Sequence, residues 1–160
     1  MASAIRPWLG LAVFIALCFL AAGIGSLWTS PNVNTWYAGL QKPPWTPPGW
    51  VFGPVWSILY LSMAVAAWLV WRKEGFSGAR LPLSLFGVQL VLNAAWSGLF
   101  FALRSPGAAL VEILLLWCAI LATTVAFWGR SRPAAWLMAP YLAWVTFAVG
   151  LNFSIWRLNS

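Results

Sequence analysis

Five apolar runs, each long enough to cross a lipid bilayer, divide this sequence. A helix needs about 20 residues to span the hydrocarbon core, where every backbone amide must be hydrogen-bonded within its own segment. The sequence therefore predicts an all-α membrane protein, a five-helix transmembrane bundle in a single domain (residues 1–160), with a long loop (29–50) between its first two helices. The helices are expected at residues 8–28, 51–71, 82–103, 107–128 and 134–156.

Charge is scarce and mostly positive. Only 7% of the residues are charged and 62% are hydrophobic, whereas a soluble domain carries about 25 % charged residues. The net charge is +7, but the basic residues flank the apolar runs, which favours a membrane anchor over a nucleic-acid partner. With five spans, six basic residues fall on the side of the N-terminus and three on the other, which predicts a cytoplasmic N-terminus. The two groups are Arg6, Arg72, Lys73, Arg80, Arg130 and Arg132, against Lys42, Arg104 and Arg157.

The sequence contains no histidine. Histidine-based metal sites, a histidine general base and a histidine ligand to haem are thereby excluded. Cys18 and Cys118 lie inside apolar runs and predict no disulfide framework. No Ser–His–Asp triad, Cys–His pair, paired carboxylates or phosphate-binding loop is present, so neither a cofactor, a metal site nor a conventional catalytic site is predicted.

The segment before the second run is rich in tryptophan and proline. Its sequence is WYAGLQKPPWTPPGW, residues 36–50. Paired prolines hold a chain extended, and indole rings offer large rigid faces. One reading is a stiff lid in which Pro47 and Pro48 hold Trp45 and Trp50 over the mouth of a pocket for a flat ligand. The other is an interfacial anchor, because tryptophan collects where membrane meets water.

Aromatic and amide side chains recur at helical spacing in three of the runs. Polar side chains are costly in a bilayer unless they face protein or a cavity, so the stripes with Gln89, Asn93 and Asn152 should point inward. Together they predict a cavity with indole walls and a few amide groups; the alternative is that the amides only hydrogen-bond between helices while the aromatics pack. The three stripes are Trp56, Tyr60, Ala64, Ala67 and Trp71; Gln89, Asn93, Trp96 and Phe100; and Tyr141, Trp144, Ala148 and Asn152.

Glu112 is the one carboxyl group well inside an apolar run, about one and a half turns into the fourth helix. It could couple transport to proton movement in a small exporter. The favoured interpretation is a helix-end acid that Arg104 or neighbouring polar groups satisfy.

Several motifs together resemble one known family. They are WYAGLQKPPWTPPGWVFGPVW, LNAAWS, PYLAW and LNFSIWRLN. They are similar to the translocator protein family, also called the tryptophan-rich sensory protein or peripheral benzodiazepine receptor family, over nearly the whole chain. The resemblance implies a five-helix bundle, of bacterial or mitochondrial outer membranes, that binds porphyrins and isoquinoline-type ligands. Some members are linked to sterols or to light-dependent breakdown of protoporphyrin IX.

The resemblance also implies site residues. Trp56 matches the tryptophan tied to porphyrin chemistry, Asn93 a ligand-contacting asparagine, and Trp144 the tryptophan of the fifth helix. With Tyr60 from the first stripe, the expected ligand-binding residues are Ala22, Trp36, Tyr37, Pro47, Trp56, Tyr60, Asn93, Trp96, Trp144 and Ala148. Phe153 stands where the family's sterol-recognition segment has a tyrosine, which argues against sterol binding. Phe153 and Ser154 also replace the tyrosine pair of animal members, so the chain resembles a bacterial member.

Three functions stay open at this point. The chain is a receptor or transporter for tetrapyrroles, an enzyme that degrades porphyrin with light and oxygen through Trp56 and Trp144, or a proton-coupled exporter. A bound porphyrin is expected to stack on indole rings and to turn its propionates toward Lys42 and Arg104. Its other expected partner is membrane lipid. A homodimer and the choice between inner and outer membrane are left open.

Overall fold

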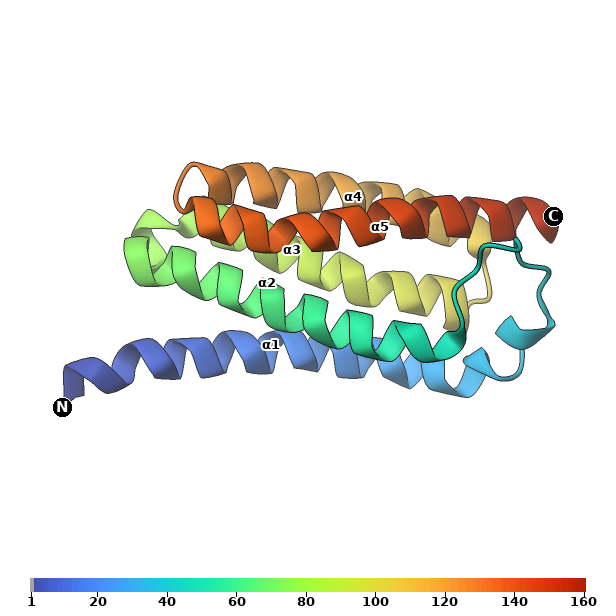
Figure 1. Ribbon diagram of the computed structural model, residues 1–160, viewed down its shortest axis with the longest axis horizontal. Helices are drawn as coiled ribbons and strands as arrows, with labels where there is room; N and C mark the ends of the chain where they lie inside the picture. Colours follow the sequence, from blue (N-terminus) through green and yellow to red (C-terminus); the bar gives the residue numbers. More distant parts are fainter. Residues whose placement is uncertain (1) are drawn as a thin grey trace.

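The computed structural model describes residues 2–160, with side chains from residue 6 onward. The described residues form five long helices packed side by side, each long and apolar enough to cross a membrane (Figure 1). This confirms the predicted all-α five-helix architecture. The helices are α1 (Ala2–Val33), α2 (Gly49–Gly78), α3 (Arg80–Ser97), α4 (Pro106–Trp128) and α5 (Arg132–Leu158).

The first helix is longer than its apolar run. α1 continues to Val33, where residues 29–50 were expected to form a loop. Polar side chains of the last turns donate back to the helix: Thr29 Oγ1 to the Gly25 carbonyl at 2.9 Å and Asn32 Nδ2 to the Trp28 carbonyl at 2.9 Å. These side-chain donors therefore find acceptors within the helix, beyond the hydrophobic stretch. The connection to α2 is therefore residues 34–48, which include the short helix η1 (Tyr37–Gly39).

The 34–48 segment is fastened to the opposite end of the chain. The Gln41 backbone N–H donates to Asn159 Oδ1 at 3.0 Å, and Asn159 Nδ2 donates to the Gln41 carbonyl at 2.9 Å. Figure 1 shows this segment at the same end of the bundle as the C-terminus, while the N-terminus and the α2–α3 and α4–α5 turns lie at the other end. The bundle thus has one end closed by short turns and one end covered by a longer segment.

A π-helical turn, η2 (Gly98–Ala102), follows α3 directly. The wider turn brings the side chains of Phe100 and Phe101, which are neighbours in sequence, into the protein interior, where both are buried. Trp36 packs on these two rings, with ring centroids 5.6 and 6.5 Å away. The turn therefore builds the small core on which η1 rests.

The main core lies on the inward face of α2. Ala64, Ala66, Ala67 and Val70 are fully buried there. Small side chains allow neighbouring helices to approach closely in a membrane, where helix association depends on packing. Large apolar side chains, such as Ile58 (67% exposed), point away from the bundle, as expected of a protein whose outer surface meets lipid.

Two helices begin with a serine cap followed by proline within the first turn. Ser105 Oγ accepts from the Ala108 N–H, and Ser131 Oγ accepts from the Ala134 N–H, both at 3.4 Å. A serine hydroxyl at this position satisfies one of the backbone amides that the first helical turn leaves without a partner.

We expect Ser105→Ala to lower the free energy of unfolding by about 1 kcal/mol, because the Ala108 amide loses its acceptor. Ser105→Asn is the matched control, since its side-chain oxygen can cap the helix in the same way. Unfolding by a denaturing detergent, followed by circular dichroism, measures both variants. Equal stability of Ser105→Ala and the parent protein would show that the cap contributes nothing.

Candidate functional site

A cavity of about 540 Å³ opens between the helices and is bordered by the 34–48 segment. Its walls come from α1, α2, α3 with η2, α4 and α5, and from the segment itself. Its volume falls within the range of about 300–1,000 Å³ that is usual for small-molecule sites. The cavity can therefore enclose a ligand of substantial size.

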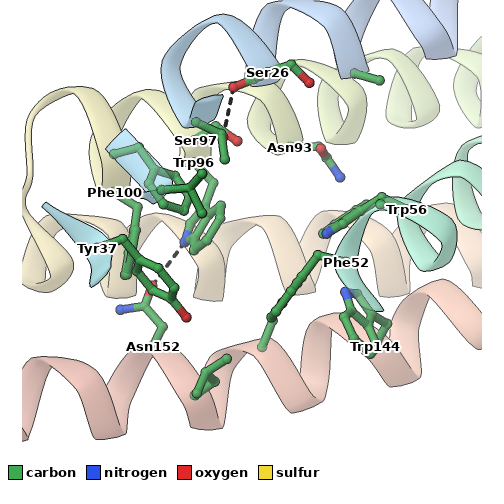
Figure 2. Close-up of a pocket in the computed structure, with 18 of the residues that line it drawn as sticks. Ser26, Tyr37, Phe52, Trp56, Asn93, Trp96, Ser97, Phe100, Trp144 and Asn152 are labelled. Carbon is green, nitrogen blue, oxygen red and sulfur yellow. Dashed lines mark hydrogen bonds between the residues drawn. The ribbon is translucent and has the colours of Figure 1, made fainter. Parts of the chain in front are cut away.

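Aromatic rings form two opposing groups on the cavity walls. Figure 2 shows Tyr37, Trp96 and Phe100 on one side and Phe52, Trp56 and Trp144 on the other. In the first group the Trp96 and Phe100 rings are stacked with centroids 4.9 Å apart. In the second, Phe52 meets Trp144 edge to face at 5.9 Å. Two facing groups of large rings suit a flat, apolar ligand.

The indole N–H groups of these walls differ in what they bind. Trp96 Nε1 donates to Asn152 Oδ1 at 3.0 Å (Figure 2). Asn152 Nδ2 in turn donates to the Pro106 carbonyl at 2.8 Å. Asn152 thus serves to join helices, which is the alternative interpretation of the amide residues. Among the hydrogen bonds of the described residues, none is donated by Trp56 or Trp144. Their N–H groups can donate to a ligand.

A buried polar chain lies behind the wall between α2 and α3. Tyr60 Oη donates to Asn93 Oδ1 at 2.5 Å, Asn93 Nδ2 donates to Tyr141 Oη at 2.6 Å, and Tyr141 donates to Gln89 Oε1 at 2.9 Å. Tyr60 and Asn93 line the cavity, whereas Gln89 and Tyr141 are fully buried and do not. The predicted inward orientation of Gln89, Asn93 and Asn152 is confirmed by their burial.

One cation lies at the cavity wall among the described residues. Lys42 Nζ donates to the Leu40 carbonyl at 3.1 Å and to the Ala38 carbonyl at 3.4 Å, and it lies 4.7 Å from the centre of the Tyr37 ring. An ammonium group has three N–H donors, so one is left for a ligand. Burial raises the pKa of the neighbouring Tyr37 hydroxyl above its ordinary value.

Arg104 does not contribute to the cavity, so the expectation that it meets ligand propionates is wrong. Its side chain is exposed and donates to Asn32 Oδ1 at 3.2 Å. Its backbone has a positive φ of 52°, at the connection between η2 and α4. This sharp turn directs Arg104 to the end of α1 and away from the cavity.

The other expected site residues lie at the cavity wall, with one exception. Trp36 does not line the cavity but supports it, through its contacts with Phe100 and Phe101. The expected residues found at the wall are Ala22, Tyr37, Pro47, Trp56, Tyr60, Asn93, Trp96, Trp144 and Ala148.

The lid interpretation, in which Trp45 and Trp50 lie over the mouth of the pocket, is wrong. Trp45 packs against Phe147 of α5, with ring centroids 5.6 Å apart, and Trp50 is 77% exposed. Neither lines the cavity, although Pro47 between them does. Trp45 thus covers part of α5, and Trp50 lies in the first turn of α2 and points away from the bundle. Their exposure agrees with the anchoring reading of this segment.

Sequence reasoning missed several wall residues that helical spacing could have found. Phe52 precedes Trp56 by four residues on α2, and Phe19 precedes Ala22 by three on α1, so each shares a face with an expected residue. Ser26 follows Ala22 by four and brings a hydroxyl to the same wall.

Glu112 has a different environment from the one expected. It is 7% exposed, and neither carboxylate oxygen has a hydrogen-bond partner among the described residues. Arg104 binds elsewhere, so the favoured interpretation of a satisfied helix-end acid is wrong. Glu112 lies on the buried face of α4. It is next in sequence to the wall residue Ile113 but does not itself line the cavity.

Comparison with known proteins places this architecture in a family. The profile of the TspO/MBR family matches residues 14–157. The chain is 45% identical over 155 residues to the translocator protein of Homo sapiens, covering 96% of this chain and 92% of that protein. It is 44% identical to the tryptophan-rich protein TspO of Chlorobaculum tepidum, over 94% of this chain and 96% of that protein. It is also 38% identical to a tryptophan-rich sensory protein of Cereibacter sphaeroides, over 95% and 92% of the two chains. With its five membrane-spanning helices and a family match over nearly its whole length, the chain belongs to the TspO/MBR family.

Proposed function

We propose that this membrane protein binds a flat, largely apolar ligand of the tetrapyrrole or isoquinoline type within its helix bundle. The observation that carries the proposal is the cavity of about 540 Å³ with two opposing aromatic walls. Aromatic pairs contribute about 0.5–1.5 kcal/mol each beyond the burial of apolar area. Several such contacts favour a broad ring system over an aliphatic chain of the same volume.

The proposed orientation follows from the polar groups of the walls. The ring lies between the Trp96 side and the Trp56–Trp144 side, and Asn93 donates to one polar edge without bringing a charge into the membrane. Acidic substituents lie toward the 34–48 segment, where Lys42 has a free donor. Charge-assisted hydrogen bonds are roughly twice as strong as neutral ones.

A second candidate function is light-driven degradation of the bound porphyrin. The free indole N–H groups of Trp56 and Trp144 support it, because both rings lie at the cavity wall and indole is the most readily oxidised side chain there. The exporter reading has no such support, since Glu112 does not line the cavity.

We expect Trp56→Phe and Trp144→Phe, singly and together, to keep binding protoporphyrin IX in the dark, with less than about a fivefold loss of affinity per residue. Phenylalanine retains most of the stacking face but not the indole chemistry. Quenching of tryptophan fluorescence in purified protein measures the affinity, and absorbance under illumination measures porphyrin loss. Lost turnover with retained binding supports the enzyme reading. Turnover that persists in the double variant removes that reading, and binding and turnover that are both unchanged in all three variants argue against the proposed pocket.

The role of Lys42 is tested by a pair of ligands with the same ring system, one with two acidic groups and one with those groups esterified. Protoporphyrin IX should bind more tightly than its dimethyl ester, and Lys42→Gln should reduce this preference about fivefold, the equivalent of about 1 kcal/mol. Arg104→Gln is the matched control, because Arg104 lies outside the cavity and should leave the preference unchanged. An undiminished preference in Lys42→Gln would place the acidic groups of the ligand elsewhere.

We also propose that the N-terminus is cytoplasmic. The N-terminus and the α2–α3 and α4–α5 turns lie at one end of the bundle, which carries six of the nine basic residues. The ligand cavity would then open toward the opposite side of the membrane. Reporter fusions that are active only on one side of the inner membrane, joined to each terminus, test this orientation; an N-terminal fusion active in the periplasm would contradict it.

A further inference from the structure

A chain of hydrogen bonds runs from the cavity wall to a buried sulfur, and all of its donors point in the same direction. Tyr60 Oη donates to Asn93 Oδ1, Asn93 Nδ2 to Tyr141 Oη, and Tyr141 Oη to Gln89 Oε1. The last link runs from Gln89 Nε2 to Met63 Sδ at 3.7 Å. The chain joins α2, α3 and α5 and then returns to α2.

The sulfur at its end decides which way the chain points. A thioether can accept a hydrogen bond but has no proton to donate. If the Gln89 amide were turned over, its oxygen would face the Met63 sulfur and two sets of lone pairs would oppose each other. Both side chains are fully buried, so water does not relieve that contact. The amide nitrogen of Gln89 is therefore held toward Met63.

Each further link follows from this first one. Because the Gln89 amide nitrogen donates to Met63, the Gln89 oxygen faces Tyr141. The Tyr141 hydroxyl must therefore donate its single proton to Gln89. Tyr141 can then only accept from Asn93, so the Asn93 nitrogen turns toward Tyr141 and its oxygen toward Tyr60. Tyr60 in turn gives its single proton to Asn93. Hydrogen-bond networks fix amide orientation in this way.

The direction of the chain determines what the cavity wall offers a ligand. The proton of Tyr60 is committed, so its phenol oxygen can only accept a hydrogen bond from a ligand. The Asn93 amide retains a second N–H that can donate one. A chain running the other way would leave the Tyr60 hydroxyl as a donor instead. Neighbouring acceptor and donor groups complement a secondary amide or lactam, which has one N–H and one carbonyl.

We propose that Met63, Gln89 and Tyr141 are specificity-determining positioning residues, and that the cavity prefers flat aromatic ligands with a secondary amide or lactam at the edge facing Tyr60 and Asn93. The proposal rests on the proposed function of the cavity as a site for flat ligands. It differs from a purely structural role of the chain, because joining three helices requires no fixed direction.

The test uses two probes, an aryl-isoquinoline carboxamide with a secondary amide and its N-methyl derivative. The parent protein should bind the secondary amide about fivefold more tightly, the effect of one net hydrogen bond. Met63→Leu keeps the side-chain volume but removes the acceptor, so both chain directions become accessible and the preference should fall to about twofold or less. Comparing the ratio between proteins cancels the bulk of the added methyl group.

Met138→Leu is the matched control. Met138 is fully buried in α5 and has no part in the chain, so this variant should keep the fivefold preference. Tyr141→Phe is the second test variant, since it removes one link and should also abolish the preference. Weaker binding of both probes with an unchanged ratio in Met63→Leu and Tyr141→Phe would mean that the chain is structural only, and would overturn the proposal.

A readout without ligand separates this proposal from the function on which it rests. The nuclear magnetic resonance signals of the Asn93 side-chain amide should shift in Met63→Leu and stay in place in Met138→Leu. Only the first change allows the hydrogen bonds of the chain to reverse their direction. Unmoved Asn93 signals in Met63→Leu overturn the proposal. Failure of the parent protein to bind either carboxamide, with the Asn93 signals moving as expected, counts instead against the proposed ligand class.

Discussion

A polar side chain inside a lipid bilayer must find its hydrogen-bond partners within the protein, and this constraint shapes the centre of the bundle. Tyr60, Asn93 and Tyr141 come from three different helices and bind one another at 2.5 and 2.6 Å. Lipid offers none of these groups an alternative partner. The polar chain therefore fixes the rotation of α2, α3 and α5 about their axes, which apolar packing alone specifies less sharply. The aromatic stripes on the same helices are turned inward as a result.

The cavity exists because bulky rings surround it without filling it. Trp96 is held by Asn152, which in turn is held by the Pro106 carbonyl at the start of α4. The π-helical turn after α3 places Phe100 and Phe101 under η1. Rings that are held from behind cannot collapse into the empty volume, so the space between the walls is retained. Such preorganisation reduces the ordering cost of binding.

The polarity of the cavity agrees with a neutral or weakly acidic aromatic ligand. Its interior polar groups are indoles, hydroxyls and two amides, and the one cation among the described wall residues is Lys42 near the mouth. Glu112 stands apart from this arrangement, buried beside the cavity with no hydrogen-bond partner among the described residues.

The sequence by itself determined the membrane location, the five helices and the inward orientation of Gln89, Asn93 and Asn152, because hydrophobic length and helical period are local properties. It also located most of the cavity wall, through spacing and family resemblance. The tertiary structure decided what depends on packing between distant segments. It extended α1 to Val33, turned Trp45 and Trp50 outward, and sent Arg104 to Asn32. It alone joined Gln89 to Met63 across 26 residues of chain, since no local pattern specifies which buried groups meet.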